Sequence, residues 1–574
     1  MPLLRHLRIP ALLCSLAVLL CELVARPYTT MGVCDDGPYI LMAQHLAATG
    51  HIVYNGWAAA MILAQLYLGA AFIKLFGFSY TTVRMSTLLI AVILAFVLQR
   101  TLVRAGISER NATLGTLALV LSPLYLMLSV TFMSDTWGLF AIVLCLYGCL
   151  RALQASTDPA SIAWLCFAIA ANAIFGTSRQ IAWLGIAVMV PSTLFLLRNR
   201  RRVFLAGSVA TIAGALFLLA CLHWLAHQPY VIHFPLFIHH FPLLHALKEL
   251  VRLFLDIPLL LLPLVATFVV ALRKGSRRTV LAISVLLLAY FFLATYPTPV
   301  RQPLTSLFER TTGDWVTVQG IFNGGGLGGA APYFLNRAAR TLLTLAGLAG
   351  LAGLLYSLLR LPRLSSTPAS TRISWPQLGV LLAPFTLAYS ILLISSVAST
   401  NNIYDRYALG LLIVPVVCLV RYFQDRIQPQ LPLATSFLIL AMAIYGIALT
   451  HNTFSFHRAR VALAAELTAN GIPLTSFDGG WEYNFDVELQ HAGHINYFLV
   501  NTPTDGYVPV ARPPGPCPMF WYYRTPHIHP LYGVSFDPNV CYGPAPFAPV
   551  HYSRWPYRTP GTLYIVRYQP PTQP

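Results

Sequence analysis

Carboxylates are scarce in this chain, and three of them stand where an apolar segment gives way to polar residues. Asp35 and Asp36 follow the apolar run 9–25, and Asp135 follows the apolar run 112–132. A carboxylate that is partly withdrawn from water at a membrane surface has a raised pKa and can act as a general base. The three acids are therefore our candidates for proton transfer.

Each of these acids also has a purely structural explanation. Asp135 can cap a helix that begins at Thr136, and Asp35 and Asp36 can simply open a polar loop. In a chain so poor in acids, their occurrence at the ends of apolar segments favours a functional site over these alternatives.

Basic residues near the same segment ends are candidates for holding a phosphate. A guanidinium binds phosphate through paired, charge-assisted hydrogen bonds. The alternative for each is an anchor whose charged end reaches the membrane surface, and Arg406 can instead pair with the adjacent Asp405. The candidates are Lys74, Arg84, Arg179 and Arg406.

The composition defines what must position these residues. The chain has 574 residues, of which 57% are hydrophobic and 10% charged, with a mean hydropathy of +0.66. Soluble proteins carry about 25% charged residues. The composition therefore excludes a disordered chain, a coiled coil and a soluble nucleic-acid-binding protein, despite the net charge of +18.

The apolar runs predict an all-α polytopic membrane protein, because about 20 apolar residues form a helix that crosses a bilayer. Thirteen crossings are predicted, at 9–25, 83–103, 112–132, 136–150, 160–177, 180–197, 203–223, 250–272, 279–296, 338–359, 376–397, 407–421 and 432–450. The first of these resembles a signal-anchor more than a cleaved signal peptide, because no clear cleavage site follows it.

Basic residues predict the orientation, because Lys and Arg in short loops mark the cytoplasmic side. With the N-terminus inside, clusters such as Arg198–Arg202 face the cytoplasm and the C-terminus lies outside. The long outer loops are then 26–82 and 297–337. Counting the apolar segment 58–76 as a crossing would reverse every later cluster, so we expect an interfacial or re-entrant helix there.

The composition changes after the last predicted crossing. We divide the chain into a membrane domain, 1–450, and an exported domain, 451–574, which holds 18 of the 41 prolines. Short segments such as Leu563–Val566 predict strands, so the exported domain should be small and α/β or β-rich. Cys517 and Cys541 can form a disulfide there or remain two free thiols.

No sequence pattern calls for a cofactor. The chain has no CxxC motif and no Cys/His spacing of a zinc site, so no cofactor is required by the sequence and a divalent metal has no support.

The acids and cations belong to a wider pattern. This pattern resembles the C-type-fold membrane glycosyltransferases that use polyprenyl-phosphate sugars, a family-39-like group that includes protein O-mannosyltransferases and lipid A aminoarabinose transferases. The matching segments are Asp35-Asp36 with Tyr39, Thr49–His51, Lys74–Phe78, Val83-Arg84, Ser134-Asp135, 404–409 and 479–484.

The resemblance implies a role for each acid and departs from the group at two positions. Asp35 would be the catalytic base, Asp36 its partner, and Asp135 a second carboxylate that shapes the acceptor site. In the aminoarabinose transferases an Arg stands where this chain has Pro38. Their Lys-Pro is also missing, since this chain has 55–58 (NGWA) in that region. Lys74, Arg84 or Arg179 would then have to hold the lipid phosphate, and Tyr39 would contribute to substrate binding.

Our leading hypothesis is a glycosyltransferase on the outer face of a bacterial cytoplasmic membrane. It would move a hexose or pentose from a polyprenyl-phosphate donor to a hydroxyl of a glycolipid, glycan or protein, by a single displacement with inversion. Its partners are these substrates and the lipid bilayer, and no nucleic acid. The alternatives are a lipid or solute transporter and a polysaccharide polymerase or ligase.

Overall fold

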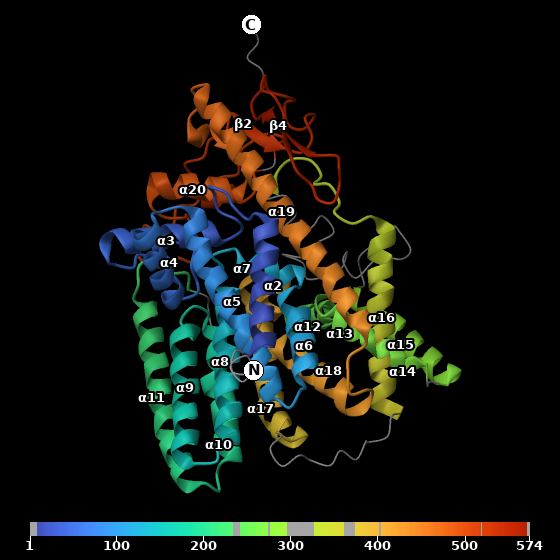
Figure 1. Cartoon of the computed structure of the whole chain (residues 1–574). Coiled ribbons are helices and arrows are strands. Elements are labelled where there is room, and N and C mark those ends of the chain that lie inside the picture. Colours follow the sequence, from blue (N-terminus) through green and yellow to red (C-terminus); the bar gives the residue numbers. More distant parts are fainter. Residues whose placement is uncertain are drawn as a thin grey trace.

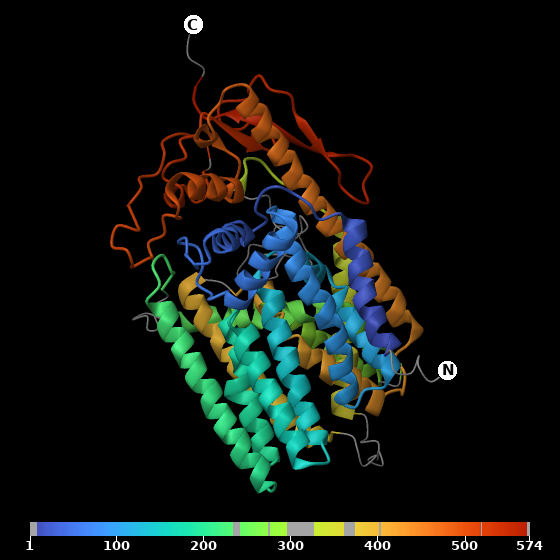
Figure 2. The same cartoon turned by 60° about the vertical axis from the view of Figure 1, so that its left-hand side comes forward.

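The computed structural model describes residues 8–233, 242–273, 276–295, 326–360, 373–400, 403–517 and 519–570. A bundle of helices forms one end of the molecule, and a small sheet with one further helix covers the other end (Figure 1, Figure 2). The predicted combination of a helical membrane body and a small C-terminal domain with strands is therefore present.

The predicted apolar runs all correspond to helical segments. The helices of the bundle and its outer end are α2 (Ile9–Ala25), α3 (Asp36–Thr49), α4 (Leu63–Phe76), α5 (Tyr80–Arg104), α6 (Glu109–Val120), α7 (Pro123–Ser129), α8 (Ser134–Gln154), α9 (Asp158–Gly176), α10 (Val190–Leu196), α11 (Arg201–Ala226), α12 (Leu243–Leu260), α13 (Leu262–Val265), α14 (Val269–Leu272), α15 (Arg277–Thr295), α16 (Arg337–Arg360), α17 (Trp375–Thr400), α18 (Ile413–Arg426) and α19 (Leu433–Ala469).

The predicted count of thirteen crossings is not confirmed. Among the described residues, seven helices are long and apolar enough to cross a membrane, or up to nine if each of two bent pairs is one crossing. The predicted crossing 112–132 is broken into α6 and α7, which meet at 70°. Pro123 has no N–H to continue the first helix and begins the second, where Ser122 accepts a hydrogen bond from the backbone of Tyr125.

Other predicted crossings differ because their helices are short or irregular. The segment 180–197 is built from a 3-10 turn, a π turn and the short helix α10. The segment 407–421 contains only the 14-residue helix α18. A 14-residue helix rises about 21 Å, which is less than the ~30 Å of hydrocarbon in a bilayer.

The first predicted outer loop contains two helices, α3 and α4, of 14 residues each. Gly50 ends α3 with a φ of 77°, the left-handed conformation that glycine adopts without steric cost. Helix α4 occupies the segment 58–76 and is likewise too short to cross a bilayer straight. Both helices lie at the end of the bundle that the C-terminal domain covers (Figure 1).

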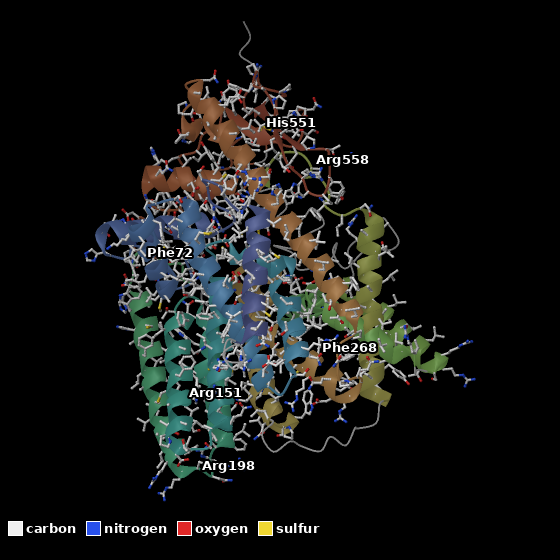
Figure 3. All side chains as sticks on the ribbon, viewed as in Figure 1. Phe72, Arg151, Arg198, Phe268, His551 and Arg558 are labelled. Carbon is white, nitrogen blue, oxygen red and sulfur yellow. A yellow bond between two sulfur atoms is a disulfide. The ribbon has the colours of Figure 1, made fainter. Side chains whose placement is uncertain are left out.

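The predicted topology assigns some basic residues to the inside of the membrane and others to the outside. Arg151 and Arg198, which are predicted to be cytoplasmic, lie toward the end remote from the C-terminal domain (Figure 3). His551 and Arg558 lie in the C-terminal domain at the other end (Figure 3). These four residues thus lie at opposite ends of the molecule, as the predicted topology requires of them.

The C-terminal domain is built on a four-stranded sheet in the order β1-β2-β4-β3. The strands are β1 (Phe477–Asp478), β2 (Tyr532–Ser535), β3 (Val550–Tyr552) and β4 (Gly561–Arg567), and α20 (Trp481–Ala492) follows β1. The predicted strand at 563–566 lies within β4. The proposed domain boundary at residue 450 falls inside α19, a 37-residue helix that continues from the bundle into this domain.

The structure pairs the two C-terminal cysteines. Cys517 and Cys541 form a disulfide with their Cα atoms 4.9 Å apart, within the usual range of 4.4–6.8 Å. The disulfide ties an irregular segment to the turn that precedes β3. Of the two alternatives that the sequence leaves open, the structure has the bridge.

We expect Cys517→Ser to lower the free energy of unfolding by about 3 kcal/mol, because a bridge across a loop of this length restricts the unfolded chain. Thermal unfolding of the purified protein with and without reductant measures this effect. Cys166→Ser is the matched control, since Cys166 is an exposed free thiol. Alkylation of Cys517 without prior reduction would show that the bridge does not form.

Candidate active site

Asp35 lies in a tight turn at the start of α3. The preceding residue, Cys34, has a φ of 56°, a left-handed conformation that costs a non-glycine residue about 1–2 kcal/mol. The Asp36 carboxylate accepts a hydrogen bond from the Val33 backbone N–H at 2.7 Å and so stabilises the turn. Asp35 is the N-cap residue of α3, but its side chain makes no capping hydrogen bond.

The Asp35 side chain instead pairs with a residue from far along the sequence. Its Oδ2 lies 2.8 Å from Nη1 of Arg406, and the two side chains are 13% and 9% exposed. Arg406 belongs to a short 3-10 helix, Asp405–Ala408, which precedes α18. Asp35 is thus a carboxylate with a positive partner and some access from outside.

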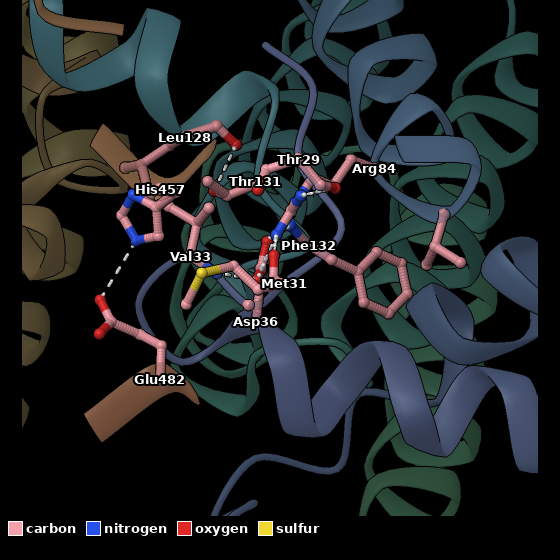
Figure 4. A network of polar contacts seen from close by, with 12 residues as sticks. Thr29, Met31, Val33, Asp36, Arg84, Leu128, Thr131, Phe132, His457 and Glu482 are labelled. Atoms are coloured by element: carbon pink, nitrogen blue, oxygen red, sulfur yellow. Dashed lines mark hydrogen bonds and ion pairs between the residues drawn. The ribbon is translucent and has the colours of Figure 1, made fainter. Parts of the chain in front are cut away.

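Unlike Asp35, Asp36 is fully buried, and its side chain faces the interior of the protein (Figure 4). Its carboxylate meets the Arg84 guanidinium with two hydrogen bonds, of 2.7 and 2.9 Å, and both side chains are 0% exposed. The Phe132 backbone N–H also donates to Asp36. Arg84 donates its remaining hydrogen bonds to the carbonyl oxygens of Met31 and Thr29.

This geometry bears on the roles that we predicted for Arg84 and Asp36. Arg84 was a candidate for holding a phosphate, but it is fully buried and its donors are occupied by Asp36 and two carbonyl groups. Asp36 accepts hydrogen bonds from both Arg84 and the backbone, so its oxygens are occupied by donors within the protein. The geometry therefore favours a structural role for this pair.

Asp135 lies in the first turn of α8, where it forms no cap, because Met133 is the N-cap residue. Its Oδ1 lies 3.0 Å from Nη1 of Arg179, and Arg179 also donates to the Ser134 hydroxyl. A Cβ on Gly138 would come within 2.9 Å of the Arg179 side chain. The absence of a side chain at Gly138 therefore makes room for Arg179 on this face of α8.

The Asp135 carboxylate is buried, with a side chain only 1% exposed. Neither of its oxygens has a hydrogen-bond partner within the described parts of the chain. A buried carboxylate normally accepts several hydrogen bonds. Apart from the ion pair with Arg179, the oxygens of Asp135 thus have capacity for a donor such as a hydroxyl group.

Tyr39 and Tyr407 each interact with both ion pairs, Asp35–Arg406 and Asp135–Arg179. The two pairs therefore belong to one site. Burial raises the pKa of Tyr39 well above its ordinary value, and the negative charges of Asp35 and Asp135 both contribute to the rise, whereas Arg406 opposes it. The Tyr407 ring lies against both guanidinium groups, 5.0 Å from that of Arg179 and 5.4 Å from that of Arg406.

Of the predicted site residues, the structure thus brings together Asp35, Tyr39, Asp135, Arg179 and Arg406. Lys74 lies apart, exposed in the last turn of α4. Among the described residues, no ion pair or hydrogen bond joins Lys74 to the other candidates. Its neighbours Leu75 and Phe76 are 73% and 70% exposed, so Lys74 lies on an apolar surface.

Sequence reasoning missed a fourth acid beside this site. Asp486, on α20 of the C-terminal domain, accepts a hydrogen bond of 3.0 Å from the Gly32 backbone N–H. Burial raises the pKa of Asp486 to about 7, although the hydrogen bonds from Gly32 and Tyr80 oppose the rise. Its only signal in the sequence is its place just after the segment 479–484.

That segment has its own buried network, part of which is visible in Figure 4. Glu482 pairs with Arg460 at 3.0 Å and lies 3.4 Å from the His457 ring nitrogen, and all three side chains are at most 1% exposed. This network joins α19 to α20 inside the C-terminal domain, which accounts for Glu482 in structural terms.

Groups of three or more His, Cys, Asp or Glu residues that could hold a metal ion are absent from the described ranges.

Residues 63–227 match the model of the dolichyl-phosphate-mannose-protein mannosyltransferase family. The match covers a part of the chain that includes Asp135 and Arg179, and it supports the resemblance to membrane glycosyltransferases that the motifs indicate. No curated protein matches the chain significantly.

Three solved structures, of two different proteins, are similar to this chain at low sequence identity. ArnT from Cupriavidus metallidurans in the apo state has 15% identity and a TM-score of 0.39, covering 82% of each chain. The same protein bound to undecaprenyl phosphate has 13% identity and a TM-score of 0.37, covering 82% of this chain and 83% of that one.

An Archaeoglobus fulgidus oligosaccharyltransferase in complex with Zn and sulfate has 15% identity and a TM-score of 0.39, covering 90% of this chain and 62% of that one. None of these scores is high enough to support an inference about this chain.

Proposed function

We propose that this protein transfers a sugar from a polyprenyl-phosphate donor to an acceptor hydroxyl. The observation that carries the proposal is the convergence of the pairs Asp35–Arg406 and Asp135–Arg179 at the ring of Tyr407, at one end of a strongly apolar helical bundle. Residues 63–227 match a family whose name includes a lipid-phosphate sugar donor, dolichyl phosphate mannose. A polyprenyl-phosphate donor for this chain agrees with that name.

Asp35 is the general base of the proposed reaction. Its carboxylate takes the proton of the acceptor hydroxyl as that oxygen attacks the anomeric carbon of the donor sugar. The bond from the anomeric carbon to the phosphate oxygen breaks, and the polyprenyl phosphate leaves with the electron pair. One base opposite the leaving group gives a single displacement with inversion of the anomeric carbon.

The other residues bind and orient the two substrates. The free hydrogen-bonding capacity of Asp135 suits an acceptor hydroxyl. Positive groups stabilise the charge that develops on the leaving phosphate, and Arg179 and Arg406 are the ion-paired cations of the cluster. The exposed apolar surface around Lys74 supports a role for this residue in contacting a lipid phosphate from the bilayer.

The proposed location is the outer face of a bacterial cytoplasmic membrane. In this orientation the N-terminus lies inside, and the C-terminal domain and the cluster around Asp35 lie outside. The basic residues at the remote end of the bundle support it, as does the disulfide Cys517–Cys541, since disulfides persist in oxidising compartments.

Mass spectrometry of envelope glycolipids, glycans and glycoproteins from a deletion strain tests the proposal. We expect one sugar to be missing and to return when the wild-type gene is restored. The purified protein should then release polyprenyl phosphate from a synthetic polyprenyl-phosphate donor carrying that sugar. Uptake of a substrate into vesicles without any covalent product would contradict the proposal and indicate a transporter.

A further inference from the structure

The turn that carries Asp35 is held from two sides by carboxylates. From the bundle side, Asp36 accepts hydrogen bonds from Val33 and Arg84. From the side of the C-terminal domain, Asp486 accepts a hydrogen bond from Gly32. Asp35 is between these two attachments, with its own side chain directed to Arg406.

Asp486 also packs tightly against the other end of the turn. A Cβ on Gly37 would lie 2.6 Å from Oδ1 of Asp486, and one on Gly32 would lie 3.0 Å from the Cα of Gly37. The two glycines therefore let the carboxyl group approach the backbone on both sides of Asp35. A larger residue at position 37 would push Asp486 or the turn out of place.

Asp486 is 6% exposed, and among the described residues its carboxyl group receives hydrogen bonds from the Gly32 N–H and the Tyr80 hydroxyl, both close to the proposed base. By contrast, Glu488 on the same helix is equally buried but bonds to His527, on the far side of α20 from the turn. Asp486 is thus the acid through which α20 contacts the turn.

We propose that Asp486 is a positioning residue for sugar transfer: it fixes the turn Gly32–Gly37, and with it Asp35, from the C-terminal domain. This inference rests on the proposed function. The reaction rate depends strongly on the position of a catalytic group, since a shift of about 1 Å can lower the rate about 100-fold. The C-terminal domain is accordingly a part of the catalytic apparatus and not only a cover for it.

The principal test is Asp486→Ala, assayed with the purified full chain and a polyprenyl-phosphate donor carrying the sugar that the deletion strain lacks. We expect kcat to fall about 10- to 100-fold while KM for the donor changes less than about threefold. Hydrogen exchange at the Gly32 amide should accelerate, because that N–H loses its acceptor. The matched control is Glu488→Gln, which should leave both measurements unchanged.

Two further variants separate positioning from a merely structural role. Asp486→Asn keeps an acceptor oxygen and should restore most of kcat, whereas Gly37→Ala should lower kcat as Asp486→Ala does. Unchanged kcat for folded Asp486→Ala, or unchanged exchange at Gly32, would overturn the inference.

The pH profile gives a third readout. The charged and titratable groups around Asp486 are Tyr80, Asp36, Arg84 and Tyr483. Its folded pKa is raised from 3.8 to about 7, so its contribution to stability is fully present below about pH 4 and is lost as the pH rises through 7. The thermal midpoint of the wild type should therefore fall from pH 6 to pH 8 more than that of Asp486→Asn.

The proposed function and this inference fail in different ways. A deletion strain that lacks no sugar, together with a purified chain that releases no polyprenyl phosphate from the donor, would reject the function, whereas an active Asp35→Asn variant would only remove Asp35 from the mechanism. An inactive Asp35→Asn variant beside an Asp486→Ala variant with normal kcat would reject only the positioning role.

Discussion

Asp35→Asn should abolish transfer while leaving the protein folded. The amide has the shape of the carboxylate but cannot take the proton of the acceptor hydroxyl, and general-base catalysis contributes about 10²- to 10⁴-fold. The amide oxygen can still accept a hydrogen bond from Arg406, whose Nη1 lies 2.8 Å from Oδ2 of Asp35, so we expect the variant to fold. Turnover of the donor by purified enzyme, together with the sugar content of a complemented deletion strain, measures the loss.

Asp158→Asn is a suitable control for this prediction. Asp158 also pairs with an arginine, Arg200, at 2.6 Å, but both side chains are well exposed, and such pairs contribute little. This variant should transfer sugar at the wild-type rate. Wild-type transfer by Asp35→Asn would remove Asp35 from the mechanism.

Asp36→Asn and Arg84→Met should each destabilise the protein strongly. Removing one partner of a buried ion pair leaves an uncompensated charge or donor, at a cost of about 3–5 kcal/mol. Arg84 also satisfies the Met31 carbonyl, so its loss should disturb the turn before α3 as well. Thermal unfolding and the yield of monodisperse protein in detergent measure the effect.

The exposed pair Arg100–Glu109 is the control for this second prediction, because its Glu109 side chain is 51% exposed. Glu109→Gln should change stability by at most about 1 kcal/mol. An Asp36→Asn variant as stable as the wild type but inactive would instead place Asp36 in the chemistry, as the family resemblance implies.

Sequence reasoning could select the residues of the candidate site because polar residues at the ends of apolar runs are few. The apolar spacing and the distribution of arginines placed Asp35 and Asp135 on the same side, and both act on Tyr39 in the structure. The strand at 563–566 followed from its run of β-forming residues between turns. Such local signals need no knowledge of how distant segments meet.

The rest depends on contacts between distant segments. Arg84 has the residue type and position of a phosphate ligand, and only the fold shows that Asp36 occupies it. Asp486 contacts Gly32 across a separation of 454 residues, which no local pattern reveals. The bend between α6 and α7 is visible as Ser122-Pro123, but an apolar run that contains a proline can also continue as a kinked helix.

The attachments of the Asp35 turn also differ in when they can form during synthesis. Asp36 and Arg84 are 48 residues apart, so the inner attachment is available early. Gly32 must wait for Asp486, 454 residues later, which at 5–20 residues per second is roughly 20–90 s. A growing chain therefore forms the turn around Asp35, the proposed general base, long before Asp486 can hold that turn in place. Under the proposed function, ribosome-bound or truncated chains should leave the donor lipid unused until the C-terminal domain is complete.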